Sequence, residues 1–126
     1  TSELVLSRAE EPGSAAIQAR WRRIATVGQR PSPRQGVRGV VFEARFIVFG
    51  GRQEGGTCLN DMWALDISPG AADSSRMWHQ VDCEGQAPSP RVWCSAAHAA
   101  YGKWFIIGGS EWQFGDMETP NDYQTL

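Results

Sequence analysis

The sequence has no long hydrophobic stretch, few cysteines and almost no lysine. No apolar run approaches the roughly 18 residues of a transmembrane helix, so no membrane-spanning helix is expected. The three cysteines are odd in number and form no Cys-x-x-Cys pair, so neither a disulfide framework nor a zinc ribbon is indicated. Neither an Asn-x-Ser/Thr glycosylation acceptor nor a signal peptide is found, and these absences together predict an intracellular, cytoplasmic location.

Charge of either sign is not in large excess. The chain has 12 basic and 14 acidic residues, a formal net charge of −2. This balance gives no electrostatic reason to expect nucleic acid or an anionic membrane as a partner. The short cluster Arg20, Arg22 and Arg23 is interpreted as a solvated strand face and not as a phosphate site. An apolar fraction of 41% with six tryptophans predicts a packed core.

An internal repeat organises the chain. Residues 28–34 match residues 85–91 at six of seven positions, with an offset of 57. The double glycine Gly50-Gly51 matches Gly108-Gly109 at an offset of 58. The pair Asn60-Asp61 matches Asn121-Asp122 at an offset of 61. The offset grows because loops between fixed strands take up insertions. The repeat predicts structural units of about 57 residues.

Each unit is predicted to contain four β-strands. Each double glycine follows four apolar residues, and an unbroken apolar run predicts a strand that is buried on both faces. The glycines permit turns and close backbone approaches that other residues do not. The complete unit is expected to have a tight turn at Glu43-Ala44 and strands at residues 37–42, 45–49, 61–67 and 77–82. The following unit repeats the strands at 92–100 and 103–107 and resumes at residue 122.

The first 27 residues are expected to end a preceding unit. Residues 3–7 align with residues 62–66 and predict its third strand, and residues 21–26 predict its fourth. The polar stretch 8–20 contains Pro12-Gly13 and is predicted to form a long turn, with a short helix at 15–20 as the alternative.

Four-stranded units of this length are typical of β-propeller blades. Small residues in the strand 92–100, and Gly39 in its counterpart, suit a crowded central axis. The chain also resembles the kelch repeat family, through these motifs: Pro33-Arg34, the apolar run into Gly50-Gly51, Asn60-Asp61-x-Trp63-x-Leu65-Asp66 and Trp78, with the copies Pro90-Arg91, Gly108-Gly109 and Asn121-Asp122. It departs from the family where a His often follows Pro-Arg, since Val37 and Cys94 stand there, and Gln124 stands in place of the aromatic that Trp63 predicts.

The resemblance implies an all-β fold, a kelch-type β-propeller of four-stranded antiparallel blades with only part of the ring present. Residues 1–27 would supply the last two strands of a preceding blade, residues 28–84 one complete blade and residues 85–126 most of a following blade. A blade cut in its third strand leaves exposed edges. The remaining blades are therefore expected from a longer chain, with the assembly of three copies as the alternative.

We first assign structural roles to the glycine, tryptophan and arginine residues of the repeated motifs. The double glycines are predicted to end strands and start loops. Trp21, Trp63 and Trp78 are predicted to lie in the core between blades. Arg34 and Arg91 are predicted to tie the Pro-x-Pro-Arg turn to a neighbouring strand or blade, with a ligand contact as the alternative.

No catalytic constellation is apparent. Kelch-fold enzymes that use copper need two Tyr, two His and a Tyr–Cys link, and nothing in the sequence places the Tyr, His and Cys residues together. In the iron-binding pattern Glu-x-x-x-Asp-x-x-x-His, Glu118 and Asp122 are followed by Leu126, so the last ligand is absent. His98 is interpreted as a structural, hydrogen-bonded residue. We therefore expect no catalysis, no metal and no cofactor in this segment.

The resemblance implies protein partners that bind through blade loops. The loop 51–59 offers Arg52, Gln53 and Glu54, and the loop 109–120 offers Glu111, Trp112, Gln113 and Phe114. Aromatic side chains in a polar, acidic loop are typical of interface hot spots, although Trp112 could instead cover the next blade. The expectation is a non-catalytic protein-interaction or scaffold segment, or a subunit of a larger assembly. The alternative is the propeller part of a larger enzyme whose active site lies outside this stretch.

Overall fold

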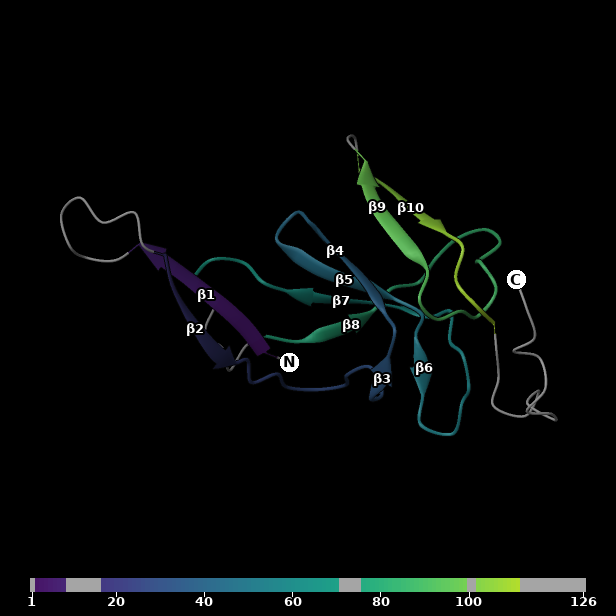
Figure 1. Cartoon of the computed structure of the whole chain (residues 1–126), viewed down its shortest axis with the longest axis horizontal. Coiled ribbons are helices and arrows are strands. Elements are labelled where there is room, and N and C mark those ends of the chain that lie inside the picture. The colour runs from purple at the N-terminus through teal and green to yellow at the C-terminus, as the bar shows by residue number, and fades with distance from the viewer. Residues whose placement is uncertain (1, 9–16, 71–75, 100–101, 112–126) are drawn as a thin grey trace, which may run out of the picture.

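Strands alone make up the regular structure of the described residues. The computed structural model describes residues 2–8, 17–70, 76–99 and 102–111 (Figure 1). Its strands are β1 (Ser2–Arg8), β2 (Ile17–Arg23), β3 (Arg34–Gln35), β4 (Arg38–Phe42), β5 (Arg45–Phe49), β6 (Arg52–Gln53), β7 (Met62–Asp66), β8 (Trp78–Gln80), β9 (Ser95–Ala99) and β10 (Lys103–Ile107). Within these ranges no helix long and apolar enough to cross a membrane is found. The all-β class predicted from the sequence is confirmed.

A four-stranded antiparallel sheet, in the order β4-β5-β7-β8, occupies the middle of the chain. Glu43 and Ala44 join β4 to β5 in a two-residue turn, both with positive φ, a conformation whose twist suits a hairpin. The register places Val48 of β5 opposite Gly39 on one side and Trp63 on the other. The strands lie within the predicted ranges, and only β8 is clearly shorter than predicted.

A cluster of buried hydrophobic residues lies on one face of this sheet. Its buried members and the residues packed on them are Val48, Trp63, Leu65 and Trp78, with Phe46 and Ile67. The rings of Phe46 and Trp78 meet edge to face, 6.3 Å apart, a favoured aromatic geometry. A side chain at Gly39 would place its Cβ 2.6 Å from the Phe46 ring, so the small residue in β4 makes room for the aromatic.

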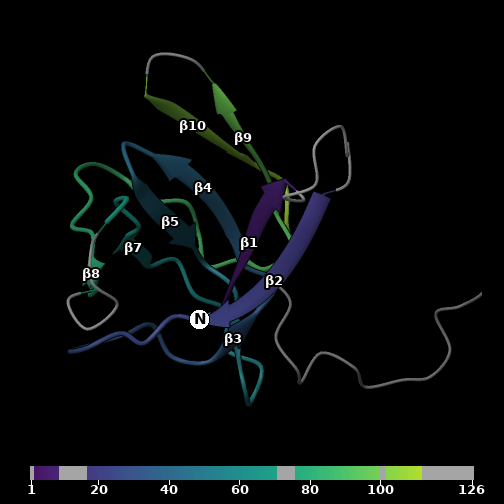
Figure 2. The ribbon, with the colours of Figure 1, turned by 90° about the vertical axis from the view of Figure 1, so that its left-hand side faces the viewer.

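The β9–β10 hairpin lies beside β4 and begins the following unit (Figures 1 and 2). Its register pairs Trp104 with His98 and Ile107 with Ser95. The sequence predicted burial on both faces of β10, and this is wrong for the described residues, because Phe105 is 50% exposed and Ile107 64%. No described element packs on that face of β10, whereas Phe49, the counterpart of Ile107 in β5, is 2% exposed.

The β1–β2 hairpin precedes the central sheet. Residues 17–20 belong to β2, so neither the long turn nor the short helix predicted there is found, because they pair in register with β1. The predicted burial of Trp21 is wrong, because β2 pairs only with β1 among the described strands and Trp21 is 71% exposed. Ile24 is buried, and the amide of Val27 donates a 3.0 Å hydrogen bond to the carbonyl of Arg76, which attaches the segment to the edge of the sheet.

Candidate protein-binding rim

The short β3–β6 ribbon lies at the end of the central sheet where β5 finishes (Figure 1). The sequence predicted an open loop over residues 51–59, but residues 52–53 form β6 opposite β3. A tight turn closes the loop, since the Gly56 amide donates to the Gln53 carbonyl at 3.1 Å. The side chain of Arg52 is buried, with 5% of its surface exposed, so it is not the loop contact that was predicted. Glu54, in the turn that follows, is exposed.

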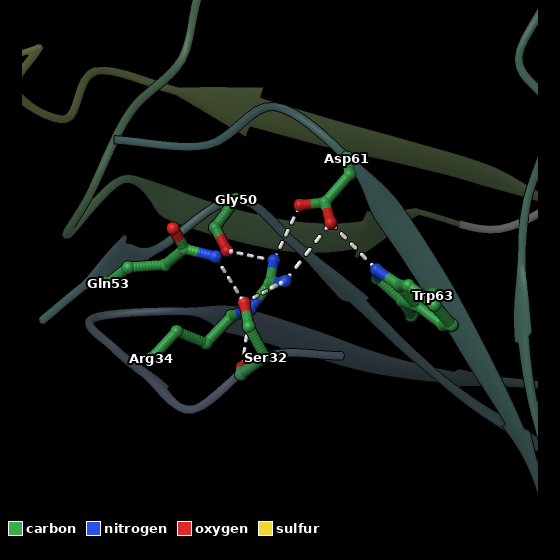
Figure 3. Close-up of polar contacts among 6 residues, drawn as sticks. All are labelled: Ser32, Arg34, Gly50, Gln53, Asp61 and Trp63. Carbon is green, nitrogen blue, oxygen red and sulfur yellow. Dashed lines mark hydrogen bonds and ion pairs between the residues drawn. The ribbon is translucent and has the colours of Figure 1, made fainter. Parts of the chain in front are cut away.

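Arg34 holds this end of the unit together (Figure 3). Its guanidinium donates to the carbonyl of Gly50 at 3.1 Å and, through both terminal nitrogens, to the Asp61 carboxylate. It also donates to the hydroxyl of Ser32, which accepts a further hydrogen bond from Gln53. A bidentate, partly buried pair of this kind fixes geometry as well as charge. Arg34 therefore ties the Pro-x-Pro-Arg turn to the ends of β5 and the start of β7.

Asp61 stays ionised within this network. Burial raises the pKa of its carboxyl, but hydrogen bonds from Arg34 and from the Trp63 indole outweigh burial and hold the pKa below the ordinary value of 3.8. The Trp63 Nε1 donates to Asp61 Oδ2 at 2.7 Å. The network thus joins the polar turn to the buried tryptophan of the core.

Arg91 repeats the contacts of Arg34 in the following unit. Its guanidinium donates to the carbonyl of Gly108 at 2.7 Å and to the hydroxyl and carbonyl of Ser89. Glu111 contacts the Ser89 hydroxyl and lies 3.9 Å from Arg91. The counterpart of Asp61, Asp122, lies outside the described residues.

The two units are joined through the backbone of Arg91. The Gly51 amide donates to the Arg91 carbonyl, and the Arg91 amide donates to the Leu59 carbonyl, each at 2.9 Å. A Cβ on Gly50 would lie 2.7 Å from the Arg91 carbonyl oxygen, closer than side chains pack. Asn60 adds a side-chain hydrogen bond to the Pro88 carbonyl at 3.3 Å. The first double glycine therefore both starts a loop and admits the neighbouring unit.

Trp93 is an exposed aromatic residue at this junction and was not among the site residues predicted from the sequence. It is 53% exposed and has a φ of 56°, a left-handed conformation that is an outlier for a bulky residue. Its amide donates to the Gly36 carbonyl at 2.9 Å, and its ring lies 5.3 Å from the buried Arg52 guanidinium, within cation–π range. The repeat aligns Trp93 with Gly36, which also has positive φ, so a tryptophan at a glycine position was the available signal.

The second predicted loop starts beside this tryptophan. Val92 forms an antiparallel backbone bridge with Ser110, so Glu111 leaves the sheet opposite Arg91, two residues before Trp93 on the facing strand. Glu111 is exposed, and Trp112, Gln113 and Phe114 lie outside the described residues. We call the exposed or half-exposed residues at this end of the two units the rim surface: Gln53, Glu54, Trp93 and Glu111. Beside it, a cavity of about 310 Å³ is lined by residues of the β3–β6 ribbon, among them Arg34 and Arg52.

The remaining predicted residues divide by burial. Trp63 and Trp78 are each 8% exposed, in contrast to Trp21. The cysteines are thiols, with Cys58 and Cys94 buried and Cys83 exposed. Within residues 2–8, 17–70, 76–99 and 102–111, no three His, Cys, Asp or Glu side chains come together as metal ligands. The rim surface offers an amide, two carboxylates and an indole.

Comparison with known proteins agrees with the repeat pattern. The family model described as the KLHDC2/KLHL20/DRC7 Kelch-repeats domain matches residues 15–124. Among curated relatives, Acyl-CoA-binding domain-containing protein 4 of Arabidopsis thaliana is 32% identical over 102 residues, which cover 79% of this chain and 14% of the relative. Host cell factor homolog hcf-1 of Caenorhabditis elegans is 30% identical over 118 residues, which cover 93% of this chain and 13% of the relative. Serine/threonine-protein phosphatase BSL2 of Arabidopsis thaliana is 29% identical over 92 residues, which cover 73% of this chain and 9% of the relative.

The match covers most of this chain but only a small part of each relative. The chain spans about a seventh or less of the length of these three proteins. The four-stranded antiparallel sheet, the duplicated arginine network and the family match agree on one architecture, that of a partial β-propeller. The chain belongs to the kelch-repeat family.

Proposed function

We propose that this kelch segment is a non-catalytic scaffold that binds a protein partner through the rim surface, alone or as a subunit of a larger assembly. Kelch repeat domains are generally protein-interaction modules and are typically not catalytic. The observation that carries the proposal is Trp93, a half-exposed indole held in a left-handed backbone conformation above the buried Arg52. A strained conformation that the surrounding structure maintains is a recognised mark of a functional position.

The indole of Trp93 is pre-organised for binding. The backbone hydrogen bond to Gly36 and the contact with Arg52 restrict the indole before any partner arrives, so binding loses less side-chain entropy. Tryptophan is enriched among residues that dominate interface energies, and polar residues usually surround it. Glu54 and Glu111 give the rim surface acidic groups, which favour a partner with an apolar pocket flanked by basic residues.

Partner capture with matched tryptophan variants tests the proposal. Trp93→Gly removes the indole and suits the left-handed backbone, whereas Trp21→Ala removes an indole that is 71% exposed but lies on β2, away from the rim. We expect capture from cell extract to fall at least ~10-fold for Trp93→Gly and to be unchanged for Trp21→Ala, since hot-spot truncation costs about 2 kcal/mol or more. Equal capture by both variants would contradict the proposal.

The loop beyond Glu111 is tested separately. Trp112 and Phe114, outside the described residues, are proposed to extend the rim surface. Their joint replacement by alanine is expected to weaken capture of the same partner without lowering the melting temperature. A large loss of stability with unchanged capture would assign both aromatics to packing.

A second candidate function is the propeller part of a larger enzyme. One relative is named a serine/threonine-protein phosphatase, and this chain covers 9% of it, so a kelch segment of this type occurs in a protein that carries an enzyme's name. Metal analysis and phosphate-ester hydrolysis by the full-length protein distinguish the two candidates. Bound metal together with hydrolysis that survives Trp93→Gly would favour the enzyme.

A further inference from the structure

The motif Pro-Ser-Pro-Arg occurs twice in the chain, at residues 31–34 and 88–91. In both copies the arginine side chain turns back and donates to the serine hydroxyl two positions before it, at 3.0 Å in the first copy and 2.7 Å in the second. A second side chain also contacts each hydroxyl, and its chemistry differs between the copies. The two copies can therefore be compared directly.

Two hydrogen-bond donors hold the hydroxyl of Ser32 (Figure 3). It accepts from the guanidinium of Arg34 and, at 2.6 Å, from the side-chain amide of Gln53. Both donor residues line the cavity of about 310 Å³, and so does the buried Arg52. Glu54, the acidic residue of the lining, is exposed. The oxygen of Ser32 thus lies beside a cavity that is lined in part by two arginines, whose guanidiniums are always charged.

A carboxylate takes the place of the amide at Ser89. The Ser89 hydroxyl donates to Glu111, which occupies the repeat position of Gln53. Two further differences near the motif have the same direction, because the first unit has a basic residue where the second has a neutral one. These positions are Arg30 against Ala87 and Arg52 against Ser110. The motif is thus identical in the two units, but the surroundings of the first copy are better suited to an added negative charge.

Contact between units leaves the serine of this motif accessible. At the second copy, where the preceding unit is present, hydrogen bonds to that unit involve the backbone of Pro88 and Arg91, and Ser89 remains half-exposed. Ser32 is half-exposed as well. Residues 28–30 before it are exposed and belong to no strand. A modifying enzyme can therefore approach Ser32 from the side of this segment.

The prolines on either side of Ser32 favour an extended backbone, because proline fixes its own φ and disfavours a helical conformation in the residue before it. Protein kinases bind their substrates as extended segments, and serine followed directly by proline is the motif that proline-directed kinases modify. Residues 28–34 therefore combine an accessible serine, this motif and a neighbouring cavity with basic side chains.

We propose that Ser32 is a phosphorylation site and that its phosphate is held by Arg34, Arg52 and Gln53. In the reaction, Ser32 Oγ attacks the γ-phosphorus of kinase-bound ATP, the bond from that phosphorus to the bridging oxygen of ADP breaks, the hydroxyl proton passes to the kinase's general base, and ADP leaves. Three strong acceptor oxygens then face donors from both β3 and β6. The modification ties these two strands together, whether or not the rim surface binds a partner.

Incubation of the chain with ATP and a proline-directed kinase tests the site. Peptide mass spectrometry should place the phosphate on Ser32, at a rate at least ~10-fold above that at Ser89, whose hydroxyl is held by a carboxylate. Ser32→Ala should abolish the faster phosphorylation and leave the slower one unchanged. Phosphorylation of Ser89 alone, or of neither serine, would overturn the proposal.

Phosphorus NMR of the phosphorylated chain shows whether the phosphate is held. The second pKa of phosphoserine is ordinarily about 6, and nearby guanidiniums favour the dianion, so this pKa should be lower in the folded chain than in the urea-unfolded chain by at least ~0.5. Gln53→Glu should bring the pKa back towards the unfolded value, and folding should persist because Glu111 occupies the same position in the second unit.

Gln18→Glu is the matched control, because it adds the same charge near the start of β2, outside the cavity lining, and should leave the pKa of the phosphate unchanged. A phosphate with the same pKa in the folded and unfolded chains would be exposed to solvent and not held by Arg34 and Arg52. That result, or a lowered pKa that Gln53→Glu does not change, would refute the proposal.

Discussion

The backbone amide of Gly51 donates a 2.9 Å hydrogen bond to the carbonyl of Arg91 in the following unit. The side chain of Arg91, meanwhile, reaches the carbonyl of Gly108 in its own unit. One residue thus connects the first double glycine to the second. The repeat is therefore coupled by backbone contacts that depend on residues without side chains, and this coupling leads to the first prediction.

Gly50→Val should destabilise the chain by about 2–4 kcal/mol, because it combines a left-handed backbone with a clash against a carbonyl oxygen. Gly55→Val is the control, since Gly55 has positive φ but no atom of the described residues lies within 4 Å of its Cβ position. The control should lose only about 1–2 kcal/mol, the cost of the left-handed backbone. Urea unfolding followed by tryptophan fluorescence measures both; equal losses would show that contact with Arg91 does not matter.

Trp63→Ala should lower the free energy of unfolding by about 3–5 kcal/mol, because a buried aromatic and its hydrogen bond to Asp61 are lost. Trp21→Ala should change it by no more than about 0.5 kcal/mol, since that indole is on an exposed face. Thermal unfolding compares the two. A similar loss for both would mean that Trp21 is covered in solution.

Acid should destabilise the chain through Asp61. Its pKa in the folded chain lies below the ordinary value of 3.8, so the unfolded chain binds the proton first as pH falls. The stabilisation is fully present above the unfolded pKa and is lost as pH falls through the folded pKa. Unfolding free energy measured between roughly pH 5 and 2 should decline, and Asp61→Asn should have a shallower decline from a lower starting value. If the unfolding free energies of wild type and Asp61→Asn declined equally steeply with falling pH, Asp61 would not be the group responsible.

Trp93→Gly should leave the free energy of unfolding within about 1 kcal/mol of wild type, because relief of the left-handed strain offsets the lost contact with Arg52. Trp93→Ala retains the strain and should be less stable than Trp93→Gly. Denaturant unfolding of the pair measures this difference. If alanine were the more stable replacement, the conformation at residue 93 would not be strained in solution.

Much of the candidate site could be anticipated where the repeat supplied two examples of the same motif. The double glycines, the Pro-x-Pro-Arg segments and the strands 38–42, 45–49, 62–66 and 103–107 recur with nearly constant spacing, so their roles could be inferred by comparison. Trp93 broke the pattern, and its importance became visible only when its φ and its contact with Arg52 were known. Arg52 looked like a loop residue because short polar strands carry no periodic signal.

The sequence by itself determined the all-β class, the length of the repeat and the order of strands in the complete unit, because these depend on local hydrophobic pattern and turn chemistry. Only the tertiary structure decided which tryptophans are buried. Trp78 and Trp21 stand at equivalent positions of the repeat, but Trp78 lies in the four-stranded sheet and is buried, whereas Trp21 lies on a two-stranded ribbon and is exposed. It also decided that the first double glycine admits the backbone of Arg91, because close approach between distant segments is a property of three-dimensional packing and leaves no trace in local pattern.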